Sequence, residues 1–251
     1  ECWTTVLLHQ FHDILPGSSI AEVYQQALVA NDEAAEAANH LVQAGLGTGD
    51  AIFNPSSTHR SGVVQVDGAL CWAEGIPPLA SGIAMAALPT SMSPVSCDGT
   101  TVDNGLISFR VGGCGCIKAL RSVDTPLGVT TDHRSRSMRL SELRLYEDRP
   151  RQWDAWNLDH DYRQHEVELP RPGRVEVVEE GPMRVVIEVQ RQIGESSSGV
   201  IRYTLDAGSR RVDITADIDW HEDRRVLRVD FPTSIRSRTA TGGIQFGCIE
   251  R

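Results

Sequence analysis

The sequence predicts a mainly β protein with a helical N-terminal piece, in which a helical hairpin precedes a large antiparallel β-sandwich. Apolar residues recur at helical spacing up to Gly45. From Ala51 onward, runs that alternate apolar and polar residues are separated by turn sequences rich in Gly, Pro and Asp. Because the pattern changes between these points, we expect residues 1–48 to form the helical hairpin and residues 49–251 a β-sandwich domain cut short at its C-terminal end.

Two helices are predicted before this boundary. The first carries apolar residues about one turn apart, at Trp3, Leu7, Leu8 and Phe11. Its run stops at Pro16-Gly17. A second helix is expected to begin at Ser19, which suits the N-cap position, and Glu22 would complete a capping box. An apolar stripe follows along this helix until Gly45 and Gly47 end it.

The rest of the chain is predicted to form strands. Short strands are expected at residues 51–53 and 62–66. Three hairpins follow, each with turn residues in its middle, at residues 106–120, 175–189 and 201–218. Long strands joined in this way favour an antiparallel sandwich over a parallel sheet. Residues 71–94 are rich in Ala, Ser, Gly and Pro and are expected to be loops with short strands.

The composition excludes several function classes. Of 251 residues, 40% are hydrophobic and 23% are charged, as in ordinary soluble globular proteins, and the net charge is -10. A nucleic acid or an anionic membrane would need a basic surface, so neither is expected as a partner. No apolar run reaches the length of a membrane span. Both ends are expected to be cuts through a longer protein, since Glu1 is not an initiating Met and Arg251 directly follows strand-like residues.

The six cysteines predict a reducing compartment. They are scattered rather than arranged in a dense disulfide framework, so we expect free thiols in a cytoplasmic protein. Cys114-Gly115-Cys116 could suggest a metal-ligand pair, but no second pair stands at ligand spacing, and the segment lies in an expected hairpin turn. We therefore interpret it as structural.

One candidate site lies at the polar break between the two predicted helices. His12 and Asp13 are adjacent there. Imidazole is a good zinc ligand, and a neighbouring carboxylate can orient it or bind sugar hydroxyls. His9 stands one helical turn earlier, but no third ligand is evident nearby. The residues alone favour a hydrogen-bonding pair at a helix end over a metal site.

The second candidate site is the segment of residues 153–162, which holds three acids, two tryptophans, one histidine and one tyrosine. Aromatic faces beside carboxylates suit sugar rings, so Trp156, Asp154 and Asp159 are candidates for substrate binding. The residues alone favour another interpretation, a loop whose tryptophans plug the edge of the sandwich while its acids stay solvated. No nucleophilic serine motif, phosphate loop or dinucleotide fingerprint is present.

Residues 10–20, which begin Gln10-Phe11-His12-Asp13, closely resemble the motif at the end of a middle-domain helix in family 38 α-mannosidases. Further stretches resemble the same family in the same order: Phe53-Asn54-Pro55 with Arg60, Asp103-Asn104-Gly105-Leu106-Ile107, Trp153-Asp154-Ala155-Trp156, Glu180-Gly181-Pro182, Asp219-Trp220, Phe231-Pro232, and Ile244-Gln245-Phe246-Gly247 with Arg251. The ordered set spans nearly the whole chain and is specific. The Phe before His12 resembles the bacterial and cytosolic branch of the family.

This resemblance implies part of a zinc-dependent retaining α-mannosidase, acting on terminal α-mannosides, with a galactose-mutarotase-like sandwich. In that family, zinc binds hydroxyls of the departing mannose, an Asp attacks the anomeric carbon, and a second acid protonates the leaving oxygen. The motif His is one of four zinc ligands and the following Asp contacts sugar hydroxyls, which implies these roles for His12 and Asp13. The nucleophile and the other ligands belong to an N-terminal α/β domain that this chain lacks. We therefore expect no catalytic residue in this chain and no activity from it in isolation.

The partners implied are mannose-containing oligosaccharides or glycosides and the N-terminal α/β domain of the same protein. Members of this branch often associate, so a homo-oligomer stays open, as does the linkage preference. The competing hypothesis is a non-catalytic carbohydrate-binding β-sandwich module. A gene that continues upstream with an α/β domain containing a His-x-Asp zinc pair would favour the mannosidase.

Overall fold

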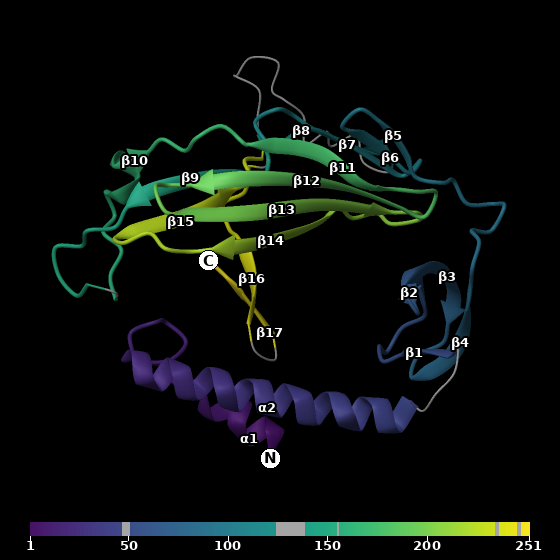
Figure 1. Ribbon diagram of the computed structural model, residues 1–251, viewed down its shortest axis with the longest axis horizontal. Coiled ribbons are helices and arrows are strands. Elements are labelled where there is room, and N and C mark those ends of the chain that lie inside the picture. The colour runs from purple at the N-terminus through teal and green to yellow at the C-terminus, as the bar shows by residue number, and fades with distance from the viewer. Residues whose placement is uncertain (47–50, 124–138, 155, 234–235, 245–246) are drawn as a thin grey trace. The chain divides into compact units, whose positions relative to one another are not determined.

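The computed structural model describes the whole chain apart from residues 47–50, 124–138, 155, 234–235 and 245–246. Four residues of the sequence patterns, Gly47, Ala155, Gln245 and Phe246, lie outside the described residues. Figure 1 shows a helical N-terminal piece followed by antiparallel sheets, which confirms the predicted fold class. The chain forms two compact units. The first comprises Glu1–Pro89, Leu145–Glu168 and His221–Leu227, and the second comprises Thr90–Arg144, Leu169–Trp220 and Arg228–Arg251.

The helical piece of the first unit is a hairpin of α1 (Cys2–Leu8) and α2 (Ala21–Leu46). The predicted capping box is wrong, because α2 begins two residues after Ser19. The Ser19 amide instead donates to the hydroxyl of Tyr24, at 3.0 Å. Gly45 does not end the helix, which continues to Leu46. A single glycine in a helix costs only about 1 kcal/mol relative to alanine, so one does not stop it.

The apolar stripe of α2 is mostly exposed. Ala27 and Ala34 are the buried residues of this helix. Leu28 and Leu41 are more than half exposed. No helix among the described residues is both long enough and apolar enough to cross a membrane.

A small four-stranded sheet of the first unit follows, with the order β1-β4-β3-β2. Its strands are β1 (Ala51–Asn54), β2 (Arg60–Val66), β3 (Ala69–Ile76) and β4 (Ala80–Met85). Residues 71–94, expected to be loops with short strands, contain most of β3 and all of β4, and residues 86–94 contain no strand. Pairing with β2 and β1 outweighs the low strand propensity of their Ala and Gly residues.

The second unit contains two four-stranded antiparallel sheets, with the orders β5-β6-β7-β8 and β11-β12-β13-β14. The strands of the first are β5 (Ser96–Asp98), β6 (Thr101–Asp103), β7 (Ile107–Val111) and β8 (Ile117–Ser122). Those of the second are β11 (Arg174–Glu180), β12 (Arg184–Ile193), β13 (Ser197–Asp206) and β14 (Asp213–Asp219). The three predicted hairpins are confirmed as β7–β8, β11–β12 and β13–β14. A register shift between Val177 and Glu179 interrupts the second.

Buried side chains join these two sheets into a sandwich. Tyr203 of β13 is fully buried, and its ring centroid lies 6.5 Å from that of Phe109 of β7. Its hydroxyl donates to the carbonyl of Gly115, at 2.8 Å. Asn104, buried between β6 and β7, donates to the carbonyls of Asp206 and Ser209 at 2.8 and 2.7 Å. Since both polar groups find partners across the sheets, burial costs them little and fixes the packing.

A three-stranded sheet has the order β10-β9-β15, and the loop between β9 and β10 contains the second candidate site. It consists of β9 (Glu142–Glu147), β10 (Glu166–Val167) and β15 (Arg225–Asp230). The loop from β9 to β10 includes a short 3-10 helix, η1 (Tyr162–Gln164). A hairpin of β16 (Thr241–Ile244) and β17 (Gly247–Glu250) lies near the end of the chain.

Candidate functional site

His12 and Asp13 lie together in the turn that follows α1. The Nε2 atom of His12 is 3.7 Å from Oδ2 of Asp13, and the two side chains are 71% and 48% exposed. Amides of Ile14 and Leu15 donate to the carbonyl of Phe11, at 2.9 and 3.1 Å, and form the turn. The structure therefore presents an accessible imidazole with a carboxylate beside it.

Hydrogen bonds to the hydroxyl of Tyr24 on α2 stabilise this turn. This hydroxyl accepts from the Ser19 amide and lies 3.2 Å from the carbonyl oxygen of Asp13, to which it can donate. The Nδ1 atom of His9, considered above as a second ligand, is hydrogen-bonded to Oδ1 of Asn31 at 3.0 Å. The backbone at Asp13 is thus anchored to α2, while the His12 imidazole stays accessible. Sequence reasoning missed Tyr24, because a tyrosine eleven residues away gives no local signal for this bond.

This turn can supply one zinc ligand, His12, but not a complete zinc site. Within the described part of the chain, no three His, Cys, Asp or Glu side chains gather in a way that could hold a metal ion. A tetrahedral zinc site needs four ligands, so His12 would have to join donors from elsewhere.

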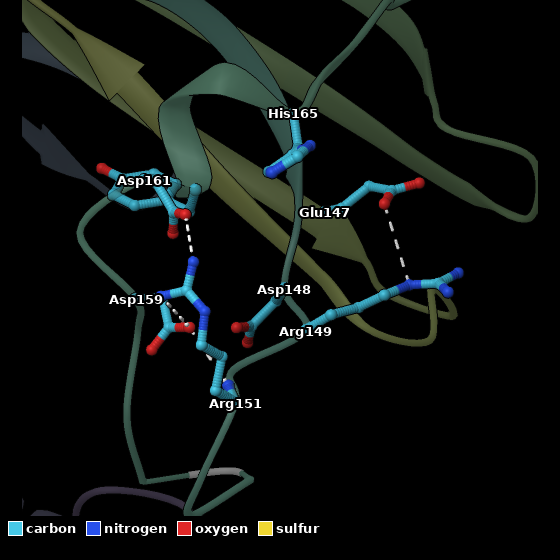
Figure 2. Close-up of a pocket in the computed structure, with 8 residues that line it drawn as sticks. Glu147, Asp148, Arg149, Arg151, Asp159, Asp161 and His165 are labelled. Atoms are coloured by element: carbon cyan, nitrogen blue, oxygen red, sulfur yellow. Dashed lines mark hydrogen bonds and ion pairs between the residues drawn. The ribbon is translucent and has the colours of Figure 1, made fainter.

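The second candidate group lies in the loop between β9 and β10, shown in Figure 2. Arg151 binds Asp159 twice: its amide donates to Oδ2 at 3.1 Å, and its Nη1 lies 3.3 Å from the same oxygen. Its Nη2 donates to Oδ2 of Asp161 at 2.5 Å. The single positive charge of the guanidinium thus lowers the repulsion between the two carboxylates.

These contacts change the pKa values of the groups. The hydrogen bond from Arg151 holds the pKa of Asp161 below its ordinary value, and the bond to Asp161 raises the pKa of Arg151. Both groups stay charged at neutral pH. Since both are solvent-accessible, the interaction is screened by water and salt.

A small charged pocket of about 160 Å³ lies against this cluster. Its walls include Glu147, Asp148, Arg151, Asp159, Asp161 and His165. In Figure 2 the Asp148 carboxylate points towards the Arg151 side of the pocket. Its Oδ1 atom is buried and has no hydrogen-bond partner among the described residues. Carboxylates and guanidinium groups around such a space suit a small hydroxylated ligand better than an apolar one.

Trp153 and Trp156 project from the same loop and are 70% and 60% exposed. The amide of Trp156 donates to the carbonyl of Trp153 at 2.9 Å. Asp154 pairs with Nη2 of Arg224 at 3.0 Å. The other interpretation of these tryptophans, as a plug in the sandwich edge, stays a hypothesis, because the loop and the sandwich belong to different units.

The structure thus assembles the candidates as two groups, His12 with Asp13 and the loop residues Asp154, Trp156 and Asp159. Sequence reasoning missed Arg151 and Arg224 as the partners of these acids. Arg151 left a signal, since it directly precedes the acid-rich segment. Arg224 lies 70 residues beyond Asp154, and only the folded chain brings the two together.

Comparison with known proteins identifies the family. Residues 102–251 match the family model described as the C-terminal domain of glycosyl hydrolases family 38, and residues 1–48 match the α-mannosidase middle domain. The chain belongs to glycosyl hydrolase family 38. The resemblance inferred from the ordered motifs is therefore confirmed.

Known members of family 38 match across the whole chain. Alpha-mannosidase 2C1 of Mus musculus is 29% identical over 99% of this chain and 26% of its own length. The α-mannosidase of Saccharomyces cerevisiae is 27% identical over 100% of this chain and 23% of its own. The chain thus spans about a quarter of the length of these curated relatives. The crystal structure of an α-mannosidase from Enterococcus faecalis has the same fold, with a TM-score of 0.67 at 12% identity, over 100% of this chain and 40% of that one.

Proposed function

We propose that this chain is part of a zinc-dependent retaining α-mannosidase that hydrolyses terminal α-mannosides in the cytoplasm. The observation that carries the proposal is the pair of family matches, to the middle domain at residues 1–48 and to the C-terminal domain at residues 102–251. A stand-alone carbohydrate-binding sandwich would not need the middle-domain segment, which makes that alternative less well supported. Mannose-containing oligosaccharides or glycosides are the proposed substrates.

His12 is the proposed zinc ligand of this chain, and Asp13 the proposed contact to sugar hydroxyls. Zinc, when bound, would supply a Lewis acid for hydroxyl oxygens. The exposed imidazole of His12 leaves room for donors from another domain. Asp13 can accept hydrogen bonds from sugar hydroxyls through a carboxylate that is about half exposed. The Tyr24 hydroxyl is hydrogen-bonded to the carbonyl of Asp13 and so anchors the backbone directly after this residue.

Trp156, Asp154 and Asp159 are proposed as further contacts to the substrate. The exposed Trp156 ring offers an apolar face to the C–H side of a sugar ring. Asp154 and Asp159 keep lone pairs free beside their arginine partners, because a carboxylate has about four acceptor sites.

The test is metal content and turnover of the full-length gene product, compared with its His12→Ala variant. We expect the variant to bind zinc at least about 100-fold more weakly, since even the loss of a group that only orients a ligand costs 10- to 100-fold. Turnover of an aryl α-mannoside should fall in parallel. Zinc by atomic absorption and initial rates give the two readouts.

The matched control is His40→Ala, because His40 is an exposed histidine of α2. It should keep both zinc and rate. Asp13→Asn should keep zinc but raise KM. A His12→Ala variant with unchanged zinc content and rate would refute the assignment of His12.

A further inference from the structure

We infer that Arg151 and Arg224 are positioning residues, which hold the loop of residues 151–161 so that its two tryptophans can meet a sugar. Each arginine forms what we call a clasp: the neck clasp joins Arg151 to Asp159 and Asp161, and the tip clasp joins Arg224 to Asp154. The inference rests on the proposed sugar contact at Trp156.

The neck clasp closes the loop at its base. Arg151 stands at one end, and its partners Asp159 and Asp161 stand at the other. Arg151 holds Asp159 with both its backbone amide and its guanidinium. Because one of these contacts involves the backbone amide, it restrains the main chain at Arg151 as well as the side chain. The neck clasp therefore holds the two ends of the loop together.

The tip clasp holds the loop where it carries the tryptophans. Arg224 lies next to β15, and its carbonyl accepts from the Asp148 amide at 2.9 Å. Its side chain reaches Asp154, the residue directly after Trp153, at 3.0 Å. Arg224 therefore links both the start of the loop and its tip to one strand end.

Backbone strain at Trp153 and Arg224 fits the inference that contacts hold these residues in place. Trp153 has φ +61° and Arg224 has φ +50°, in the left-handed region that side chains other than Gly rarely adopt. Such conformations persist where surrounding contacts hold them. The amides of Trp156 and Asn157 both donate to the Trp153 carbonyl, so the backbone at Trp156 is tied to the strained residue.

Preorganisation explains why this arrangement would matter for binding. Trp153 and Trp156 expose large apolar faces to water, which is unfavourable unless a ligand covers them. A loop already held in its bound form loses less conformational entropy when the sugar docks. Loss of a clasp should therefore weaken sugar binding even though neither arginine need touch the sugar.

The experiment is a titration of the full-length gene product with methyl α-mannoside, followed by tryptophan fluorescence and calorimetry. Arg151→Ala and Arg224→Ala should each weaken binding about two- to fivefold, the range expected for exposed ion pairs. Arg224→Lys should return to within about twofold of wild type, because it keeps a positive charge opposite Asp154. Arg211→Ala is the control, since Arg211 forms an exposed pair with Asp213, the first residue of β14, and should change nothing.

Two outcomes would overturn the inference: arginine variants that bind as well as wild type, or an Arg224→Lys variant as weak as Arg224→Ala, which would mean that the positive charge opposite Asp154 does not support sugar binding. Trp156→Ala tests the underlying contact. If it binds like wild type, or if wild type does not bind, the proposed sugar contact fails.

In that case, amide hydrogen exchange of residues 151–161, measured without sugar, tests the two clasps independently of sugar binding. Faster exchange in both arginine variants than in Arg211→Ala supports them, and unchanged exchange rejects them.

Discussion

At the scale of single residues, two buried groups of the sandwich must stay neutral. Burial raises the pKa of Tyr203 and of Cys116 to about 12 each. The Tyr203 hydroxyl donates a hydrogen bond to the Gly115 carbonyl, and its oxygen lies 2.8 Å from Oγ of Ser141. Loss of either proton would leave a negative charge in the core, and the cost of burying that charge outweighs the attraction of the nearby Arg191, so the folded state resists ionisation.

We therefore predict a loss of stability at alkaline pH. Both folded pKa values lie above the ordinary ones, near 9 for Cys and 10 for Tyr, so their contribution is complete below about pH 9 and lost as pH rises towards 12. Urea unfolding from pH 7 to 11 under reducing conditions measures this. Tyr203→Phe should flatten the decline by about 1–3 kcal/mol while lowering stability at pH 7.

Cys116→Ala should flatten the decline from a lower pH, while Cys248→Ala is the control because Cys248 is exposed. A Tyr203→Phe profile as steep as that of wild type would contradict the argument.

At the scale of elements, the turn between β7 and β8 depends on one glycine. Gly115 has φ +71°, and a Cβ atom there would lie 2.6 Å from Cγ1 of Val189 on β12. The amide of Gly115 also donates to the Gly112 carbonyl at 2.8 Å. The turn is therefore pressed against the second sheet, and Cys116, which follows it, is buried for the same reason.

Gly115→Ala should destabilise the sandwich by about 1–3 kcal/mol, because it adds both backbone strain and a clash with a buried side chain. Gly113→Ala is the matched control two residues earlier, since its Cβ would meet nothing within 4 Å. Equal unfolding midpoints for the two variants in urea would show that the close approach of the turn is not needed.

The observed helices and strands also show which features the periodicity of the sequence could predict and which it could not. The long hairpins were predictable because alternation over many residues reports which face is buried. The bounds of β3 and β4 were not predictable because their Ala, Ser and Gly residues have little strand propensity of their own, and pairing with neighbouring strands decides them. The start of α2 was misplaced by two residues because Tyr24, rather than a Ser19 cap, organises the turn before it.

At the scale of the whole molecule, the proposed zinc site would need ligands from outside this chain. The chain carries matches to a middle and a C-terminal domain and spans about a quarter of its curated relatives. A single exposed histidine cannot close a four-ligand zinc site. The division into residues 1–48 and 49–251 stays a prediction.

We accordingly predict that the isolated 251-residue chain does not hydrolyse an aryl α-mannoside, with or without added zinc. The full-length gene product, assayed beside it at equal concentration, should do so. Circular dichroism of the isolated chain would establish that it is folded. Zinc-dependent turnover by the folded isolated chain would show that its own residues complete a catalytic site.

The sequence by itself determined the family, the fold class and the placement of His12 and Asp13 in a turn after the first helix. These follow from local order, because motifs and periodicity are properties of neighbouring residues. Only the tertiary structure decided what holds each site. Tyr24 reaches Asp13 across a helical hairpin, and Arg224 reaches Asp154 from a distant strand end. Contacts between residues far apart in the chain leave no periodic pattern, because they depend on how the chain folds back on itself.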